Sequence, residues 1–481
     1  MRVFAAFYSI LSIFLSGHVF CSVEGTFYPS DRSELSRLLD SLVKPAEKGV
    51  MKNIYGILVP HAGYAYSGRI AGLAYGSIEG EFDTVLILAP SHYKYSSRAV
   101  LFPEKSFSTP LGEIKVDTGL EKKLASVKDI FCESEEAFSQ EHAIKTQFPF
   151  LTKKFGNSIK VLPILISSDD AKTAEKTALA IFSAVKKKKT LIVISSDLAH
   201  YPSHEDALRI NEIMLRAILP MDAGFLKATA DFIMKKSVAG LVTTACGLGA
   251  IETGIEILRL GGNKKTVQIA ASNSWLENKD SDSLRTVGYV ALAFYGGGEK
   301  SLYMLSENEK KELIKIARSA IEYRFTGVKP SAPVSALFSL PVPVFVTLNL
   351  YGRLRGCVGF TYGYMSLGEG VANAAEMAAF EDKRFEPLSK QEAENVKIEI
   401  SLLGAPRRIG SWLQATEGKG VLIRNGENSG LFLPEVWKKI PERNKFFENL
   451  CSQKAGLEKE CYKSAKTEIY IFETDVIEED I

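Results

Sequence analysis

Three segments in the first half of the chain place polar, chemically versatile side chains directly after short apolar runs. His61 and His92 each follow a run of strand length, and the motif Ser195-Ser-Asp-Leu-Ala-His-Tyr201 follows another. In a parallel α/β sheet the carboxyl ends of the strands form the crevice in which ligands bind, so these segments should converge although they are distant in sequence. Imidazoles delivered by rigid strand ends favour a metal site, which needs at least one further ligand.

Other residues of the first half are candidates for that ligand or for proton transfer. Cys246 precedes a predicted helix, where backbone N–H groups favour the thiolate that metals prefer. Asp197 and His200, three residues apart, suit a group that orients a ligand and a group that transfers protons, or further ligands. Glu141 and His142 add a carboxylate and an imidazole. Plainer interpretations stay open, with Cys246 as a small buried residue and Glu141 as a helix cap.

The elements that must position these side chains are strands of a mostly parallel sheet. Continuous apolar runs, of the kind buried on both faces of such a sheet, occur at 55–59, 84–89, 160–166, 190–194, 266–270 and 287–294. A helix is predicted at 171–189, because acidic residues precede it and lysines close it. The first half is therefore predicted to be an α/β domain.

Composition limits the class of protein and its partners. A chain of 481 residues with 46% apolar and 24% charged residues is expected to fold into two domains with sizeable cores. With 59 Lys and Arg against 57 Asp and Glu, the net charge of +2 gives no reason to expect a nucleic acid partner. None of the six His lies beyond residue 204, so imidazole chemistry belongs to the first half.

The second half is predicted to be a separate α+β domain. A glycine-containing linker at 298–303 is expected to join the first domain, 24–297, to the second, 304–481. The second domain is predicted to contain helices at 307–324 and 367–380, a hairpin at 342–360, and strands at 396–402, 420–426 and 431–434.

One further candidate site lies on the returning strand of that hairpin, in Leu354-Arg-Gly-Cys-Val-Gly359. Glycines on both sides of Cys357 suggest a close backbone approach and an accessible thiol, and Arg355 offers an anion-binding group. Packing is the favoured role for Cys357, because a half without His offers no obvious base.

The N-terminal segment 1–22 resembles a signal peptide or an uncleaved anchor. Met1-Arg2 precedes thirteen uncharged residues, and small and polar residues follow. We therefore expect an exported or membrane-anchored protein, with a cytoplasmic protein translated from a misplaced start as the alternative. In the exported case, Cys451 and Cys461 are close enough in sequence to form a disulfide.

Six ordered motifs of the first half resemble the Memo family over about residues 24–297. They are Gly25-Thr-Phe-Tyr-Pro-Ser-Asp31, Pro60-His-Ala-Gly-Tyr-Ala-Tyr-Ser-Gly68, Ala89-Pro-Ser-His-Tyr93, Glu141-His-Ala-Ile144, Ser195-Ser-Asp-Leu-Ala-His-Tyr201 and Ala245-Cys-Gly247. The resemblance implies the fold of class III extradiol dioxygenases, which are non-haem iron enzymes with two His and one Glu as ligands.

The same resemblance implies roles for particular residues. His61 and His92 match the two His ligands, and Cys246 stands where the dioxygenases have a carboxylate. Asp197 and His200 line the pocket, with His200 at the position of the acid/base His, and the Glu141-His142 pair lies nearby.

A soft thiolate ligand changes which metal is expected. It favours iron or copper, with zinc as the alternative, in a role other than straightforward ring cleavage. We expect redox or oxygen-dependent chemistry on an unknown substrate. One alternative is a non-catalytic adaptor that binds a peptide or protein in the same pocket, and another is nucleophilic hydrolysis by Cys246 or Cys357.

The second half resembles the AMMECR1 family over about residues 304–478. The matching motifs are Leu354-Arg-Gly-Cys-Val-Gly359, Ala379-Phe-Glu-Asp-Lys-Arg-Phe-Glu-Pro-Leu388, Val396-Lys-Ile-Glu-Ile-Ser401 and Ser429-Gly-Leu-Phe-Leu-Pro434. A Memo domain fused to an AMMECR1 domain resembles proteins B and A of the AmmeMemoRadiSam system. This implies a radical SAM enzyme as a partner, which conflicts with export because its iron–sulfur cluster needs a reducing compartment.

Overall fold

The computed structural model describes residues 23–47, 49–296, 302–328 and 335–479. The segment 1–22, predicted to be a signal peptide or anchor, lies outside the described residues, as does most of the predicted linker at 298–303. Across those described ranges, the structure contains no helix that is both long and apolar enough to cross a membrane.

The first domain is built on a mixed sheet with a parallel centre. Its strands follow the order β4 (Ser106–Thr109), β5 (Gly112–Val116), β7 (Lys160–Ile166), β2 (Thr84–Pro90), β8 (Thr190–Ser195), β1 (Ile54–Val59), β10 (Gly288–Gly296) and β9 (Asn263–Asn273), with β3 (Ala99–Leu101) and β6 (Phe131–Glu133) off this path. From β5 to β1 the neighbouring strands are parallel, whereas β10, β9 and β4 pair antiparallel.

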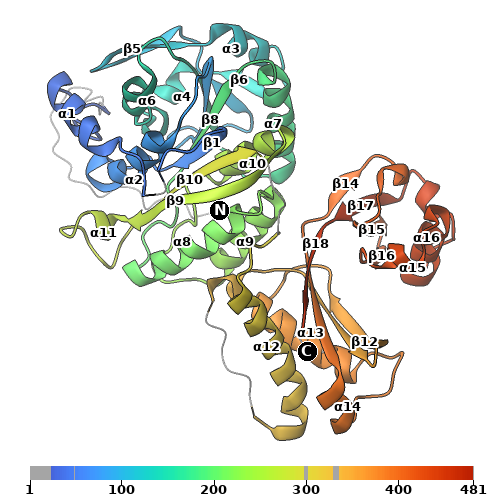
Figure 1. Cartoon of the computed structure of the whole chain (residues 1–481). Coiled ribbons are helices and arrows are strands. Elements are labelled where there is room, and N and C mark those ends of the chain that lie inside the picture. The colour runs from blue at the N-terminus through green and yellow to red at the C-terminus, as the bar shows by residue number, and fades with distance from the viewer. Residues whose placement is uncertain (1–22, 48, 297–301, 329–334, 480–481) are drawn as a thin grey trace, which may run out of the picture.

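Helices cover both faces of this sheet (Figure 1). One face carries α1 (Arg32–Leu42), α2 (Tyr64–Ser77) and α6 (Phe148–Phe155), and the other carries α7 (Ala171–Val185), α8 (His204–Ile218), α9 (Ala223–Lys235) and α10 (Leu248–Leu260). The remaining helices are α3 (Thr118–Ala125), α4 (Glu135–Ser139), α5 (His142–Lys145) and α11 (Ser274–Glu277).

The continuous apolar strands of the sequence result from this two-sided burial. Along β2, Leu86 and Leu88 belong to one core, whereas Val85 and Ile87 belong to the core on the opposite face. Because successive strand side chains point to opposite faces, a strand covered by helices on both sides must be apolar at every position.

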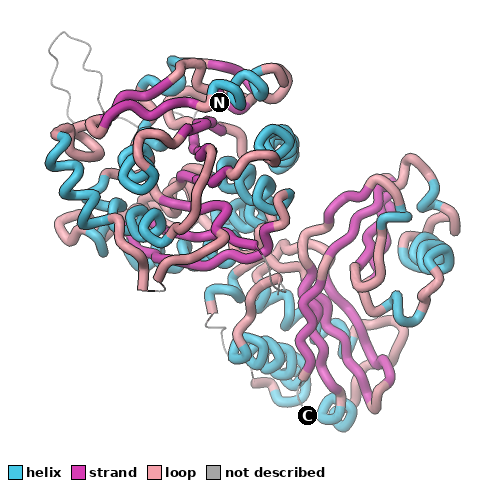
Figure 2. The backbone as a smooth tube through the Cα atoms, turned by 45° about the horizontal axis from the view of Figure 1, so that its top comes forward, coloured by secondary structure: helices cyan, strands magenta, loops and turns pink. Residues whose placement is uncertain are grey.

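The second domain contains two antiparallel sheets (Figure 2). One has the order β12 (Arg353–Phe360), β11 (Val344–Leu350), β13 (Lys397–Leu403) and β18 (Thr474–Glu478), and the other has β14 (Arg407–Ile409), β17 (Glu468–Phe472), β15 (Gly420–Asn425) and β16 (Asn428–Phe432). Its helices are α12 (Glu307–Thr326), α13 (Leu367–Phe380), α14 (Lys390–Asn395), α15 (Val436–Lys439) and α16 (Arg443–Asn449), with short turns at Ala336–Ser339, Trp412–Gln414, Leu450–Lys454 and Cys461–Lys463. This is the α+β class predicted from the sequence.

A disulfide stabilises the second domain in addition to its two sheets. Cys451 and Cys461, ten residues apart, form a disulfide inside the core that packs on β15 and β17.

The two domains also contact each other, and Arg216 of α8 in the first domain forms an ion pair with Glu309 of α12 in the second at 3.2 Å. Phe225 of α9 also packs edge to face on Tyr303, so the two domains share an apolar contact.

Candidate metal centre

The strand ends that carry the candidate residues meet at one edge of the sheet. The strands β2, β8 and β1 are neighbours in the sheet, and each is parallel to the next. His92, Asp197 and His61 each stand two residues beyond the end of one of these strands. The topology therefore brings together side chains that are up to 136 residues apart in sequence.

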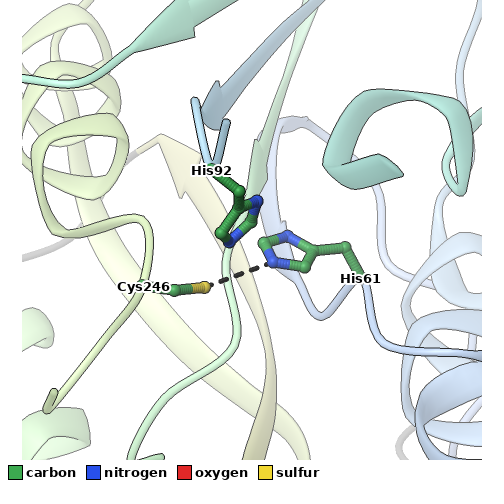
Figure 3. A group of neighbouring side chains, drawn as sticks. All are labelled: His61, His92 and Cys246. Carbon is green, nitrogen blue, oxygen red and sulfur yellow. Dashed lines mark hydrogen bonds between the residues drawn. The ribbon is translucent and has the colours of Figure 1, made fainter. Parts of the chain in front are cut away.

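His61, His92 and Cys246 point toward one another (Figure 3). One ligand atom from each residue lies within 4.8 Å of the other two. The Cys246 Sγ is 3.2 Å from His61 Nε2, and the two imidazole rings meet edge to face at 5.3 Å. His61 is buried whereas His92 is exposed, so solvent reaches the group from the His92 side.

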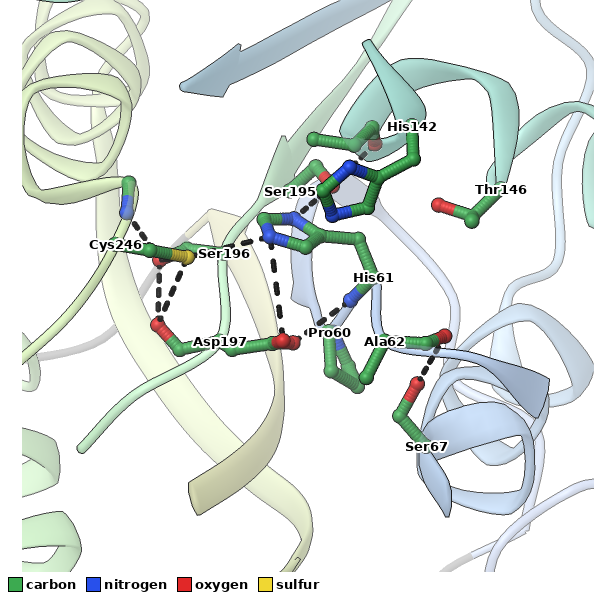
Figure 4. Close-up of polar contacts among 12 residues, drawn as sticks. Pro60, His61, Ala62, Ser67, His142, Thr146, Ser195, Ser196, Asp197 and Cys246 are labelled. Atoms are coloured by element: carbon green, nitrogen blue, oxygen red, sulfur yellow. Dashed lines mark hydrogen bonds and ion pairs between the residues drawn. The ribbon is translucent and has the colours of Figure 1, made fainter. Parts of the chain in front are cut away.

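Hydrogen bonds fix which nitrogen of His61 faces the group (Figure 4). Its Nδ1 lies 2.9 Å from the Ser195 hydroxyl, which itself donates to the carbonyl of Ala143. Gln147 donates to the same hydroxyl oxygen. Because the hydroxyl proton is already used, Nδ1 must carry a proton and donate it, which leaves the Nε2 lone pair directed at Cys246.

His92 is oriented by a buried carboxylate. Glu141 accepts hydrogen bonds from the His92 ring Nδ1 at 2.9 Å and from the His92 backbone N–H at 2.7 Å. It also caps α5 by accepting from the Ala143 N–H. A carboxylate on Nδ1 directs Nε2 to the opposite side and raises its basicity, the usual arrangement behind a metal-binding His.

The loop that carries Cys246 packs tightly on the end of β8. The next residue, Gly247, donates its N–H to the Ser196 hydroxyl at 2.9 Å, and a Cβ at Gly247 would lie 2.8 Å from that side chain. Only glycine allows this close approach. The predicted preference of Cys246 for the thiolate does not hold for the protein without metal, because burial raises the pKa of the thiol above its ordinary value.

Three imidazoles of the centre, those of His61, His92 and His142, differ in their affinity for protons. Burial lowers the pKa of His61 well below its ordinary value, and it lowers that of His142 to about 4, with neighbouring His92 as a further cause. For His92, burial lowers the pKa, but the hydrogen bonds that the ring donates to Cys246 and Glu141 outweigh this effect and raise the pKa to about 10. The centre thus concentrates its affinity for one positive charge at His92, between a thiol and a carboxylate.

Asp197 and His200 border the same group. Asp197 is buried, accepts the backbone N–H of His61 at 2.8 Å, and has a pKa raised by burial. His200 Nδ1 lies 2.7 Å from the Leu198 carbonyl, so Nδ1 donates and Nε2 keeps its lone pair. Tyr201 follows with a φ of 70°, a left-handed conformation that few residues with side chains adopt.

His142 lies against the ring of His92. The two rings stack at 4.7 Å, and Phe27 covers the other side of His142 at 4.5 Å. His142 Nδ1 is 3.6 Å from Glu141, and this buried atom has no hydrogen-bond partner among the described residues. The structure therefore brings together all seven residues that the sequence assigned to this site.

Sequence reasoning missed the residues that orient the ligands. Ser195 is the first residue of the Ser195–Tyr201 motif, but nothing in the sequence indicates its contact with His61. Gln147, which links Ser195 to the carbonyl of Pro60 and to the hydroxyl of Tyr75, lies in a helical stretch with no distinguishing pattern.

Cys357 and Arg355 belong to a different environment in the second domain. Cys357 Sγ accepts a hydrogen bond from Thr347 at 3.3 Å, and burial raises the pKa of the thiol. Arg355 makes a two-pronged ion pair with Glu392 through Nε and Nη2, so a carboxylate of the same domain already balances its charge. Among the described residues, the Cys357 thiol is hydrogen-bonded to a hydroxyl, and Asp382 accepts the backbone N–H of the same residue.

The sheet has a parallel centre, and two imidazoles beyond its strand ends face a thiol from the loop before α10. This arrangement defines an α/β protein with three side chains that could hold a metal ion. Comparison with known families gives the particular family. Residues 21–293 match the Memo-like protein family, and the chain belongs to that family. The AMMECR1 family matches residues 314–477, so the protein is a fusion of the two domains.

Individual relatives agree with this assignment. A protein of Sulfolobus acidocaldarius, named as a MEMO1 family protein, is 32% identical over 288 residues, which is 57% of this chain and 98% of that protein. A MEMO1 family protein of Aquifex aeolicus is 32% identical over 276 residues, covering 57% of this chain and 97% of its own length. The crystal structure of an uncharacterized protein from Pyrococcus horikoshii is similar to 37% of this chain and 94% of its own, at 31% identity and a TM-score of 0.34.

Proposed function

We propose that the first domain binds one iron or copper ion through His61, His92 and Cys246 and uses it for redox or oxygen-dependent chemistry on a small substrate. The observation that carries this proposal is the convergence of three ligand atoms within 4.8 Å. Two of these atoms are imidazole nitrogens, and Ser195 and Glu141 orient their rings.

The donor set suits a transition metal. A thiolate and two imidazoles match the ligand softness of copper, zinc and iron, and do not suit magnesium or calcium, which prefer oxygen ligands. The high proton affinity of His92, held between Cys246 and Glu141, indicates that the site stabilises a cation at this position. A metal would take the place of that proton and of the thiol proton, so binding should strengthen as the pH rises.

The surrounding residues have separable tasks in this proposal. When bound, iron or copper supplies one-electron chemistry or activation of oxygen. Glu141 and Ser195 hold the two ligating rings, and Asp197 holds the backbone of His61. His200, whose Nε2 keeps a free lone pair, is the group that would accept or return a proton of the substrate.

The adaptor alternative rests on the exposed tyrosines beside the centre. Tyr93 and Tyr95, which follow His92, are 59% and 76% exposed. Exposed aromatic side chains are common in protein interfaces. A peptide bound across them would reach the same centre without any turnover, and a radical SAM enzyme remains the proposed partner of the two-domain chain.

Elemental analysis of the full chain, purified without added metal, tests the proposal. We expect near-stoichiometric iron or copper in the native protein and its loss in the His61→Ala/His92→Ala variant. His204→Ala is the matched control, because His204 bonds Asn273 and stacks on Trp275 away from the ligand group. Absence of metal from all three proteins after reconstitution would refute the metal centre and favour the adaptor.

A further inference from the structure

A cavity of about 720 Å³ opens where the two domains meet, away from the metal centre. From the first domain it is lined by the turn between α8 and α9, by Phe225 and by Arg259. From the second domain it is lined by Leu302 and Tyr303 and by the chain segments that connect the two sheets. Figure 1 shows these connections, between β13 and β14 and between β17 and β18, rising beside α9.

The inner wall of the cavity is apolar and aromatic. Met221, Phe225 and Tyr303 are buried, and Phe472, also buried, lines the cavity from the second domain. The rings of Phe225 and Tyr303 meet edge to face at 5.4 Å, and the Tyr303 hydroxyl is bonded to the Leu403 carbonyl. Because these rings are held by one another and by the backbone, they form a preformed surface for a flat apolar group.

The acidic residues at the cavity are already satisfied by the protein. Asp222 accepts the Phe225 N–H at the start of α9, and Asp475 accepts the N–H groups of Leu302 and Tyr303. Glu473 pairs with Lys419, which also lines the cavity. These carboxylates therefore fix the wall and do not require a cation from outside.

Among the basic residues that line the cavity, Arg407 has no side-chain partner among the described residues. Arg259 pairs with Glu256, but Arg407 makes no side-chain hydrogen bond or ion pair with any described residue. Arg407 lies at the start of β14, opposite Ile471 of β17, so its guanidinium is carried by a paired strand next to the apolar wall. A guanidinium stays charged at any physiological pH and presents a planar fork of donors that suits carboxylate and phosphate groups.

We propose that this interdomain cavity binds an organic anion with a flat apolar body. The ring system of the ligand would lie on Phe225 and Tyr303, and its carboxylate, phosphate or sulfonate would pair with Arg407. The volume lies within the range of about 300–1,000 Å³ that is usual for small-molecule sites, which are common at domain interfaces. A molecule bound here contacts both domains and therefore opposes their separation.

Titration of the full chain with anilinonaphthalenesulfonate, an aromatic sulfonate whose fluorescence rises in apolar surroundings, tests this proposal. We expect saturable binding of one probe per chain. Arg407→Gln should weaken binding by about ten-fold or more, since a charge-assisted pair is lost. Ala405→Trp, which places a large ring in the cavity, should weaken it similarly.

Two controls keep the result specific. Arg408→Gln removes the neighbouring charge on the same strand and should leave binding of the probe unchanged. The Arg408 side chain pairs with Glu468 and does not line the cavity. His61→Ala/His92→Ala should also bind the probe normally, because the cavity is independent of the metal centre. Equal affinities of the Arg407→Gln and Arg408→Gln variants, or no saturable binding to the native chain, would overturn the proposal.

Discussion

The two domains each contain a partly exposed cysteine next to a glycine, and the surroundings of these cysteines are opposite in kind. Cys246 faces two imidazoles that follow β1 and β2, the two strands that flank β8. Cys357 lies on a hairpin strand, where its thiol meets the hydroxyl of Thr347 and its backbone is held by Asp382 and Arg384. The sulfur itself is the same, so the difference in expected chemistry comes from the fold around it.

The comparison shows that a parallel sheet and an antiparallel hairpin place polar groups differently. Adjacent parallel strands end at the same edge, so loops from distant parts of the chain bring independent ligands to one point. A hairpin brings together residues that are close in sequence, and β11 and β12 offer Cys357 only Thr347 as a side-chain donor. The first arrangement suits binding of a metal, whereas the second suits packing.

The largest expected effect separates the two cysteines directly. Cys246→Ser should abolish near-stoichiometric metal binding, because the soft ligand is lost, whereas Cys357→Ser should leave the metal content unchanged. Elemental analysis gives the metal content, and alkylation of the native chain gives a second measure. Bound metal should protect Cys246 from alkylation and not Cys357. Equal metal loss in both variants would end the distinction.

A pH titration tests a buried acid of the first domain. Both carboxyl oxygens of Glu252 are buried without a hydrogen-bond partner among the described residues, and burial raises its pKa from 4.5 to about 8. The folded state therefore binds this proton more tightly than the unfolded state. The free energy of unfolding should fall as the pH rises between these two values, by at most about 4–5 kcal/mol.

Chemical denaturation across that pH range measures this loss. Glu252→Gln, which cannot ionise, should flatten the pH dependence and be more stable than the native chain above pH 8. An unchanged slope in the variant would show that other groups cause it. Among the described residues of the second domain, no buried carboxyl group has both oxygens without a hydrogen-bond partner.

The stability of the second domain should depend instead on its disulfide. Replacing Cys451 and Cys461 together by Ser removes a short covalent loop and should cost about 3 kcal/mol of unfolding free energy, in the chain-entropy view. Denaturation of the native chain with and without reductant should give the same difference. Cys357→Ser is the control, since Cys357 is not part of a disulfide, and an equal loss of stability there would contradict the assignment.

The smallest expected effect concerns the orientation of His61. Ser195→Ala removes the acceptor that fixes the proton on Nδ1 and should weaken metal affinity by about ten-fold. Competition with a chelator measures this change. Ser67→Ala is the matched control, because the Ser67 hydroxyl bonds only the Ala62 carbonyl in the same domain. Identical affinities of the two variants would show that Ser195 does not position His61.

Much of the fold follows from local patterns in the sequence. The strand at 160–166 and the helix at 367–380 have the bounds that the sequence predicts, because apolar runs and capping residues act locally. The antiparallel pairing of β10 and β9 at the edge of the sheet is set by long-range contacts and had no such signal. The helix predicted at 171–189 ends at Val185, because the following lysines lie in a turn near Asp117, which pairs with Lys188.

The candidate site was predicted only in part, for a similar reason. The ligand side chains stand out as rare residue types at strand ends, so His61 and His92 were visible in the sequence. The partners that set their protonation, Ser195 and Gln147, are common residues whose importance depends on distances across the fold. The raised pKa of Cys246 likewise depends on burial, which no local pattern shows.

The hydrogen bonds that Asp382 and Arg384 make with the backbone of Cys357 also affect how copies of this protein can associate. The strand β12 is the outer strand of its sheet, so its outward N–H and C=O groups are open to pairing with a strand of another molecule. Asp382 occupies the N–H of Cys357 and Arg384 its carbonyl, and the two side chains are paired with each other. This charged pair occupies the N–H and C=O groups in the middle of β12, so it opposes strand addition by another molecule at this edge of the sheet.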